Sequence, residues 1–164
     1  MNKEEIYTFL KNKNIWYEIT EHEAVFNMKE LDKIKLPYPE CDAKNLFCRD
    51  DKKKNYYLIT VKKDKRVDLK AFQQQNNTRR LSFASPDDLK EILNLIPGSV
   101  TPLGLLNDAN CQVKFYLDEY FLKDKQIIGI HPNDNIATVW LKVSDLIDII
   151  KENGNEVNII EIKE

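Results

Sequence analysis

The sequence predicts an α+β fold in which helices flank a mixed β-sheet. Short segments of alternating apolar and polar residues, which are typical of strands, are interspersed with segments whose apolar residues recur at helical spacing. The two kinds of segment do not follow the regular strand–helix–strand order of a doubly wound protein. The 164 residues are 42% hydrophobic and 32% charged, which suits one globular domain over 1–164.

The N-terminal part combines a helix and a strand. The helix is predicted over 3–13, where apolar residues recur one turn apart, and the strand over 15–19, where they alternate. Asn27 followed by Glu30 resembles a capping pattern, which predicts a short helix there. Two prolines in 36–40 predict a loop.

The middle of the chain begins with a predicted hairpin. Its strands cover 46–48 and 56–61, and the charged segment 49–55 forms the turn. A helix over 67–75 and a short strand over 80–85 are predicted to follow.

The next helix has a well-defined start. Ser85 can cap it, Pro86 suits its first position, and Asp87 and Asp88 favour the positive end of the helix dipole. The helix ends before 96–108, which contains two prolines and two glycines and is predicted to be a loop.

The C-terminal part is predicted to contain a final helix among several strands. This helix has Ser144 as its cap and stops at Gly154. The strands are predicted over 111–118, 126–130, 137–143 and 157–163.

Composition restricts the classes of function. With 25 basic and 27 acidic residues the net charge is -2, so a nucleic-acid partner would have to meet a local basic patch. Cys41, Cys48 and Cys111 form no CxxC pair, which predicts free thiols in a reducing compartment. The sequence has no bilayer-spanning apolar run and no signal-peptide pattern, so we expect a cytoplasmic protein with no membrane partner.

The signatures of common hydrolases are absent. The two histidines, His22 and His131, belong to no HExxH or Cys-His cluster, so no metal ion or other cofactor is predicted. His22 is expected to be a surface or loop residue. There is no GxSxG elbow and no Walker loop. Hydrolysis by this chain would therefore use neither a metal nor a recognisable nucleophile.

Lys44 and Asn45 stand where a strand is predicted to begin. A lysine there adds nothing to a core, so the pair is either a solvated strand end or part of a pocket that needs a positive charge. Successive residues of a strand point to opposite faces. Both residues can therefore serve one site only at the start of a strand or in a twisted one.

Two loops have unusual compositions. The segment "GSVTP" at 98–102 is either a helix-to-strand connection with Gly98 as helix cap, or a fixed loop whose N–H groups face a ligand. The segment "HPNDN" at 131–135 is either a hairpin turn with a hydrogen-bonded histidine or one wall of a pocket.

Basic residues cluster while acidic residues lie largely toward the C-terminal part. Such clusters are either solvated or form a basic face. They comprise Lys52, Lys53, Lys54, Lys62, Lys63, Lys65, Arg66, Arg79 and Arg80.

In this order, the motifs "KNLFCRD…YYLITV", "RVDLKAF", "RLSFASPDDL", "PGSVTPLGLLND" and "HPNDNIATVWL" resemble the YbaK/ProX family, over about 21–150. These proteins are free-standing relatives of the editing insertion domain of bacterial prolyl-tRNA synthetase. The resemblance implies a curved mixed sheet with flanking helices, and hydrolysis of wrongly charged aminoacyl-tRNA. The subgroup that the chain resembles most removes alanine from tRNA(Pro), and a related subgroup removes cysteine.

The resemblance also implies roles for individual residues. Lys44 would be catalytic. Substrate contacts would come from Asn45, Gly98, Ser99, Val100, Thr101, Pro102, His131 and Asn135. The basic residues expected to meet tRNA are Lys52, Lys53, Lys54, Lys62, Lys63 and Arg66. Ile136 stands where the family usually has threonine, and it would make the pocket more apolar if it faced that pocket.

The implied reaction is attack of a positioned water molecule on the aminoacyl ester. Lys44 and N–H groups of the 98–102 loop would stabilise charge on the carbonyl oxygen. A small second pocket is useful because a missing methylene changes binding to a synthetase by only about 1–3 kcal/mol. The alternatives are a Cys-tRNA(Pro) deacylase and a non-catalytic tRNA- or aminoacyl-binding regulatory module. The expected partners are the acceptor end of tRNA(Pro) and, transiently, prolyl-tRNA synthetase.

Overall fold

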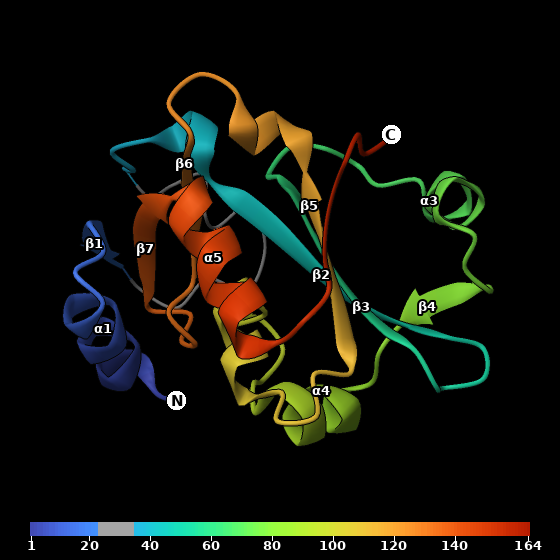
Figure 1. The fold of residues 1–164 in the computed structure, drawn as a ribbon. Helices are drawn as coiled ribbons and strands as arrows, with labels where there is room; N and C mark the ends of the chain where they lie inside the picture. Colours follow the sequence, from blue (N-terminus) through green and yellow to red (C-terminus); the bar gives the residue numbers. More distant parts are fainter. Residues whose placement is uncertain (23–34) are drawn as a thin grey trace.

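Two sheets form the frame of the protein, which the computed structural model describes over residues 1–22 and 35–164 (Figure 1). An antiparallel sheet has the strand order β1-β7-β6, and a mixed sheet has the order β4-β2-β3-β5-β8. The strands are β1 (Tyr17–Glu21), β2 (Ala43–Asp50), β3 (Tyr56–Lys62), β4 (Leu81–Phe83), β5 (Val113–Asp118), β6 (Ile127–Ile130), β7 (Ala137–Lys142) and β8 (Val157–Ile160). The predicted α+β class with a mixed sheet is confirmed.

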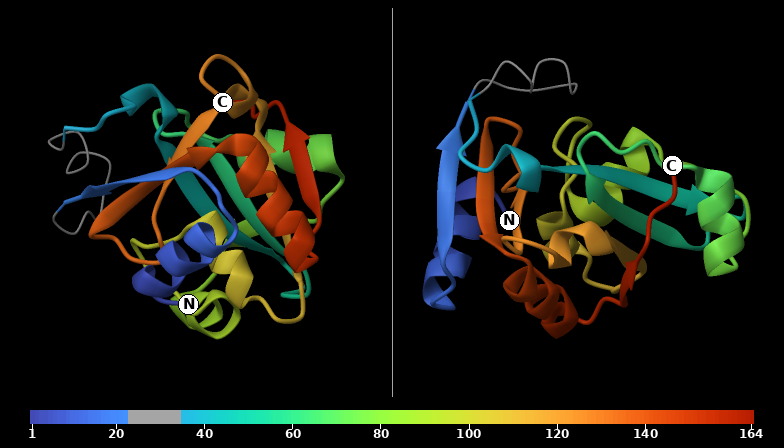
Figure 2. Two further views of the ribbon diagram at one scale, coloured as in Figure 1. Left: turned by 60° about the vertical axis from the view of Figure 1, so that its left-hand side comes forward. Right: turned by 90° about the horizontal axis from the view of Figure 1, so that it is seen from above.

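Helices cover the outer surfaces of this frame. Seen from above in Figure 2, the three-stranded sheet lies at one side, β2 and β3 extend toward the other, and α3 lies at the far end. The α-helices are α1 (Lys3–Asn12), α3 (Leu69–Asn76), α4 (Pro86–Leu93) and α5 (Val143–Asn153), and the 3-10 helices are η1 (Pro39–Cys41), η2 (Pro102–Asn107) and η3 (Glu119–Leu122).

Among the described residues, the two sheets meet at one bridge, between Asp42 and Gly129. This bridge is parallel, so β2 and β6 leave it in the same direction. A Cβ atom on Gly129 would lie 2.3 Å from the ring of Trp140, which explains why only glycine fits at this point. The indole of Trp140 is fully buried against the junction.

Two apolar clusters lie on opposite faces of the five-stranded sheet. The larger one fills the space toward the three-stranded sheet and includes Leu58, Phe115, Val139 and Leu146. The smaller one lies under α3 and includes Cys48, Ile59, Phe72 and Ile162. Because strand residues alternate between faces, neighbours in β2 and β3 contribute to different clusters.

Several predicted boundaries shift, and one predicted cap is wrong. Strand β1 starts at Tyr17 instead of residue 15. Strand β2 starts at Ala43, three residues before the predicted start, because Ala43, Lys44 and Asn45 already pair with β3. Ser144 does not cap α5: the cap position is Lys142, and the first helical N–H, from Val143, donates to the carbonyl of Gln126 at 2.9 Å.

The other differences concern loops. The segments predicted as loops at 36–40 and 96–108 contain the 3-10 helices η1 and η2. The helix predicted from Asn27 and Glu30 lies outside the described residues.

Candidate functional site

His131 lies at the start of the turn between β6 and β7. Its Nδ1 is 2.9 Å from the carbonyl oxygen of Ala137, so Nδ1 donates and the neutral ring carries its lone pair on Nε2. Nε2 has no hydrogen-bond partner among the described residues. Burial lowers the pKa of His131, and the neighbouring His22 lowers it further. The site therefore contains a neutral imidazole with an available acceptor.

The 98–102 loop is fixed to the His131 turn by Thr101. The Thr101 hydroxyl, fully buried, donates to the carbonyl oxygen of His131 at 2.6 Å. Gly98 does not cap α4, because Asn94 takes the left-handed cap position, with φ of 54°. Gly98 instead has a φ of +93° within the loop, which a side chain would disfavour. Pro102 is buried and begins η2.

The N–H groups in this loop are not all engaged. Ser99 donates its N–H to the carbonyl of Ile96 at 3.1 Å, and its hydroxyl donates to the same carbonyl at 2.8 Å. The backbone N–H groups of Val100 and Thr101 have no partner within the part of the chain that the structure describes. Val100 is partly exposed, whereas Thr101 is fully buried.

A small pocket lies where the loop meets the turn. Its volume is about 240 Å³, and it is lined by Asn94, Leu95, Ile96, Ser99, Asn133, Asp134 and Asn135. Asn135 is 7% exposed, and its side-chain nitrogen has no partner among the described residues. Ile136 is exposed, so it does not belong to the core. It does not line this pocket either.

His22 is the site residue that sequence reasoning missed. It was expected to be a surface or loop histidine, and it does follow the end of β1 outside any helix or strand. Its ring is nevertheless half-buried, and its Nε2 lies 3.0 Å from the hydroxyl of Thr138. The His22 and His131 rings meet edge to face, with centroids 6.3 Å apart. The missed signal is the end of β1: Glu21 pairs with Ala137, which places the next residue beside the His131 turn.

One face of the three-stranded sheet carries this polar group. In β7, Thr138, Trp140 and Lys142 alternate with the core residues Val139 and Leu141, so the first three share the face opposite that core. The indole N–H of Trp140 donates to the hydroxyl of Thr20 at 2.9 Å. The face that holds the two histidines thus continues along the whole of β7.

Lys44 and Asn45 point to opposite faces of β2. They pair with Val61 and Thr60 of β3, as second and third residues of a regular strand. Asn45 accepts a hydrogen bond of 2.6 Å from the buried hydroxyl of Thr60. The ammonium of Lys44 donates to the backbone carbonyl of Lys65 instead. The structure therefore does not bring the two polar groups together on one face.

Lys44 occupies a partly buried and electropositive position. Burial and then the charge of Arg66 lower the pKa of its ammonium. Asn45 and His131 stand three and two residues beyond the Asp42–Gly129 bridge, on strands that leave it in the same direction. They lie at similar heights, about 7–10 Å past the bridge at roughly 3.3 Å per residue.

Asp42, two residues before Lys44, is a buried carboxylic acid. Its Oδ1 accepts the N–H of Ala43 at 3.1 Å, and its Oδ2 has no partner among the described residues. Burial raises its pKa to about 7, against the opposing charge of Lys63. Asp42 is 4% exposed, so it shapes the junction of the sheets and does not face solvent.

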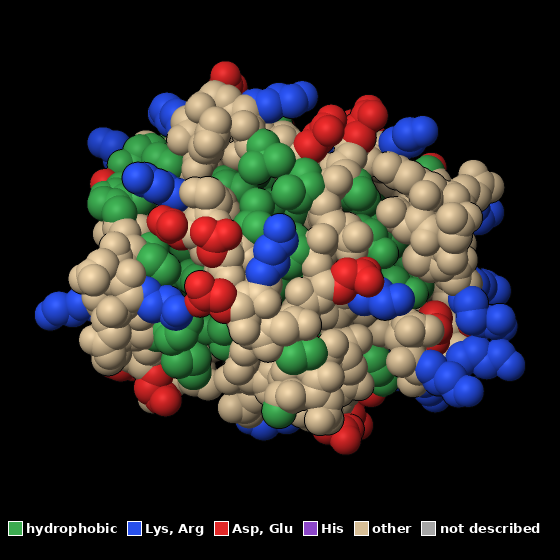
Figure 3. Space-filling view, in the orientation of Figure 1, with side chains coloured by type: hydrophobic (Ala, Val, Ile, Leu, Met, Phe, Trp, Pro, Cys, Tyr) green, Lys and Arg blue, Asp and Glu red, His purple; other side chains and the backbone are tan. Residues whose placement is uncertain are grey.

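The predicted basic clusters form two separate patches. Lys62, Lys63 and Arg66 lie at the end of β3, near the start of β2, whereas Lys52, Lys53 and Lys54 form the turn at the far end of the hairpin. Figure 3 shows basic side chains gathered over that turn, at the right of the molecule. A strand of this length separates the patches by about 23 Å.

Within 1–22 and 35–164, no three His, Cys, Asp or Glu side chains are grouped so that they could hold a metal ion. No helix in these ranges is both long and apolar enough to cross a membrane.

Comparison with known proteins identifies the family. Residues 21–149 match the model of the aminoacyl-tRNA editing domain, which covers most of the chain. The chain belongs to the aminoacyl-tRNA editing family. It is therefore an editing enzyme, a hydrolase, as the resemblance of its motifs predicted.

Relatives of this editing enzyme extend from bacteria to mammals. It is 39% identical over 160 residues to the prolyl-tRNA editing protein ProX of Acetoanaerobium sticklandii, covering 98% of this chain and 97% of the relative. It is 34% identical over 142 residues to prolyl-tRNA synthetase associated domain-containing protein 1 of Mus musculus, covering 85% and 83% of the two chains. A solved structure of a candidate trans-editing enzyme for prolyl-tRNA synthetase matches with a TM-score of 0.71 and 18% identity over 99% and 96% of the chains, which shows a shared fold.

Proposed function

We propose that this editing enzyme hydrolyses the ester of alanine on tRNA(Pro), acting in trans in the cytoplasm as one domain over 1–164. The observation that carries the proposal is the neutral His131 imidazole with an available Nε2, fixed between the 98–102 loop and His22. Every aminoacyl ester carries an amino group that can donate to such an acceptor. The prolyl-tRNA specificity is supported by the name of the Acetoanaerobium sticklandii relative.

The loop supplies donors for the reacting carbonyl in this proposal. Attack of water on the ester places negative charge on the carbonyl oxygen. The N–H groups of Val100 and Thr101, which have no partner among the described residues, would stabilise that charge. Water needs only to be positioned, because an aminoacyl ester is already labile.

Lys44 acts on the tRNA side of the ester. Its ammonium already has a backbone oxygen, that of Lys65, as its partner. We infer that it exchanges this carbonyl for a phosphate or ribose oxygen of the terminal nucleotide when tRNA binds, while Asn45 orients the substrate from the other face of β2. Lys44 lies on the α3 side of β2, so its side chain would reach the ester by passing round the edge of β2 that β4 leaves unpaired, and it would then favour charge on the carbonyl oxygen.

Selectivity for a small amino acid rests on the size of the site. The pocket between Ser99 and Asn135 measures about 240 Å³, which is below the 300–1,000 Å³ typical of pockets for larger ligands. A site of this size admits alanine, and exclusion of proline would come from the shape of the pocket and not from its volume. Cysteine is the nearest competitor, because it adds only a thiol to the same skeleton.

The deciding experiment is deacylation of tRNA(Pro) charged separately with alanine, cysteine, serine and proline. The proposal expects alanine to be released fastest and proline to be retained, with the same rates in EDTA because no metal is used. Faster release of cysteine would assign the chain to the Cys-tRNA(Pro) deacylases. Binding of all four charged tRNAs without hydrolysis would make it a regulatory binding module.

A further inference from the structure

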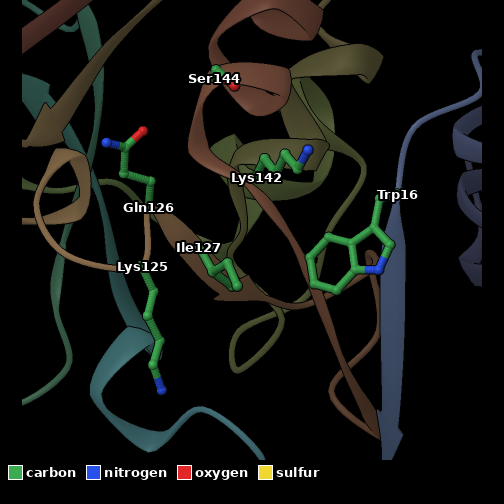
Figure 4. A pocket seen from close by; sticks show the side chains of 6 residues that line it. All are labelled: Trp16, Lys125, Gln126, Ile127, Lys142 and Ser144. Atoms are coloured by element: carbon green, nitrogen blue, oxygen red, sulfur yellow. The ribbon is translucent and has the colours of Figure 1, made fainter.

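A second open groove lies at the other end of the face that carries the histidines. Its volume is about 530 Å³, and its lining residues are Trp16, Lys125, Gln126, Ile127, Lys142 and Ser144. In the close-up of Figure 4, the indole of Trp16 extends from the β1 side toward Ile127, with Lys142 beside it. We propose that this groove binds an unpaired nucleotide of the tRNA, with its base stacked on Trp16 and its phosphates near Lys142 and Lys125.

The exposure of Trp16 points to a stacking partner. Its side chain is 39% exposed, whereas Trp140, the other tryptophan, is fully buried. An exposed indole in a concave site offers a flat π-surface, and every nucleobase can stack on such a surface whatever its sequence.

The charges of the groove favour a polyanion. Lys125 and Lys142 line it, and no acidic residue does. Lys142 makes no ion pair with any residue that the structure describes. Lys125 pairs with Glu40 at 2.5 Å, outside the lining, so its charge is partly balanced and Lys142 is the main cation of the groove. An aromatic platform in a positively charged groove is the usual arrangement for unpaired nucleic acid.

The distance between groove and histidines fits the unpaired end of a tRNA. Thr138, which contacts His22, and Lys142, which lines the groove, lie on one face of β7 four residues apart. That separation is about 13 Å at roughly 3.3 Å per residue. Stacked nucleotides advance about 3.4 Å each along a strand, so about four of them span it. A base near the start of the unpaired 3′ end would therefore reach Trp16 while the ester lies at His131.

This inference rests on the proposed function for its choice of tRNA, but its test does not depend on catalysis. The probe is uncharged, fluorescently labelled tRNA(Pro), measured by anisotropy with Trp16→Ala, Trp16→Phe and Ile19→Ala. Ile19 is a matched control, since it is 41% exposed on β1, three residues after Trp16, and lines no part of the groove. We expect Trp16→Ala to weaken binding by roughly tenfold or more, and Trp16→Phe to recover much of it. Ile19→Ala should bind as the wild type does.

A second probe separates stacking from general affinity. A single-stranded RNA tetranucleotide should quench the tryptophan fluorescence of the wild type but not of Trp16→Phe, while a blunt RNA hairpin should quench neither. Lys142→Ala should make the slope of log K against log salt for the tetranucleotide less steep by about 0.7. Lys151→Ala, on the exposed side of α5, should leave that slope unchanged.

Catalysis distinguishes the two proposals. Under single turnover, Trp16→Ala should need more enzyme for half-maximal rate but keep the wild-type rate at saturation. Equal tRNA and tetranucleotide binding by Trp16→Ala and Ile19→Ala would overturn the groove assignment. Absence of deacylation by the wild type on every charged tRNA would overturn the proposed function, and the binding measurements would still decide the groove.

Discussion

The hydroxyl of Thr101 donates a 2.6 Å hydrogen bond to the backbone carbonyl of His131. This contact joins the two loops whose motifs lie thirty residues apart in sequence. It also fixes the height of the imidazole relative to the N–H groups of the 98–102 loop. The geometry of the site therefore depends on one buried side chain that need not touch substrate.

Thr101→Val should disturb this geometry. Valine keeps the shape but leaves the His131 carbonyl without its donor, which costs about 1–3 kcal/mol for a buried group. We expect a lower free energy of unfolding in urea and a slower single-turnover rate. Thr101→Ser keeps the hydroxyl and serves as control. A Val variant as active as the Ser variant would show that this contact does not position the histidine.

Lys44→Ala should slow hydrolysis by on the order of 10²-fold or more, the scale seen when one oxyanion donor is removed. Affinity for tRNA should change little, since it is spread over many phosphate contacts. Lys44→Arg should recover only part of the rate, because a planar guanidinium does not replace a compact ammonium. The measurement is single-turnover deacylation of Ala-tRNA(Pro) beside a thermal melt, with Lys11→Ala on α1 as control. Wild-type rates in a folded Lys44→Ala protein would leave Lys44 as a solvated strand residue.

His131 should impose an acid limb on the pH–rate profile. Its pKa is lowered from 6.5 by burial, so the ring is neutral near pH 7 and becomes cationic only at lower pH. A cationic ring donates at both nitrogens and no longer accepts, so the rate should fall with a midpoint below 6.5. His131→Ala should remove this limb and change the preference among alanine, cysteine and serine more than the affinity for tRNA. An unchanged preference would make His131 a turn residue only.

Asp42→Asn should stabilise the protein at neutral and alkaline pH. Folding raises the pKa of Asp42 from 3.8 to about 7, so the folded state holds a proton that the unfolded chain loses. Stability from this group is present below pH 3.8 and is lost as pH rises through 7. A shift of about three pKa units corresponds to roughly 4 kcal/mol at most. Urea unfolding at several pH values should show the two proteins diverging as pH rises, and parallel curves would contradict the assignment.

The two basic patches should contribute separately to tRNA affinity. Each neutralised phosphate of a duplex adds about -0.9 to the slope of log K against log salt. Replacing Lys62 and Arg66 by alanine should therefore make the slope less steep by about 1.8. The variant with alanine at Lys52, Lys53 and Lys54 tests the distant turn in the same titration. An unchanged slope for either variant would remove that patch from the binding surface.

The periodicity of apolar residues, together with capping and turn residues, predicted most elements of the fold. The structure keeps several local signals: the alternation in β3, β5 and β7, the cap Ser85, and the acidic Asp88 in the first turn of α4. Ser144 shows the limit of such signals. Its cap role is superseded by strand β7, which continues to Lys142, and by the Gln126 carbonyl, which binds the first helical N–H.

The site was only partly predictable, because it depends on strand register. The 98–102 loop and the His131 turn were recognised from their motifs, and their contact through Thr101 agrees with a shared pocket. The opposite directions of Lys44 and Asn45 follow from an early start of β2, which pairing with β3 decides. His22 was missed because its neighbours Thr138 and His131 are more than a hundred residues away in sequence.

Within the described residues, one bridge between Asp42 and Gly129 and the packing of the larger apolar cluster hold the two sheets together. A ladder of many hydrogen bonds resists rotation of one strand against another, whereas one bridge can act as a pivot. A small rotation of the three-stranded sheet about this point would change the distance from Asn45 to His131 and leave the pairing inside both sheets intact. The distance between β2 and the His131 turn is therefore set chiefly by how the side chains of that cluster pack, and a core substitution far from both can change it.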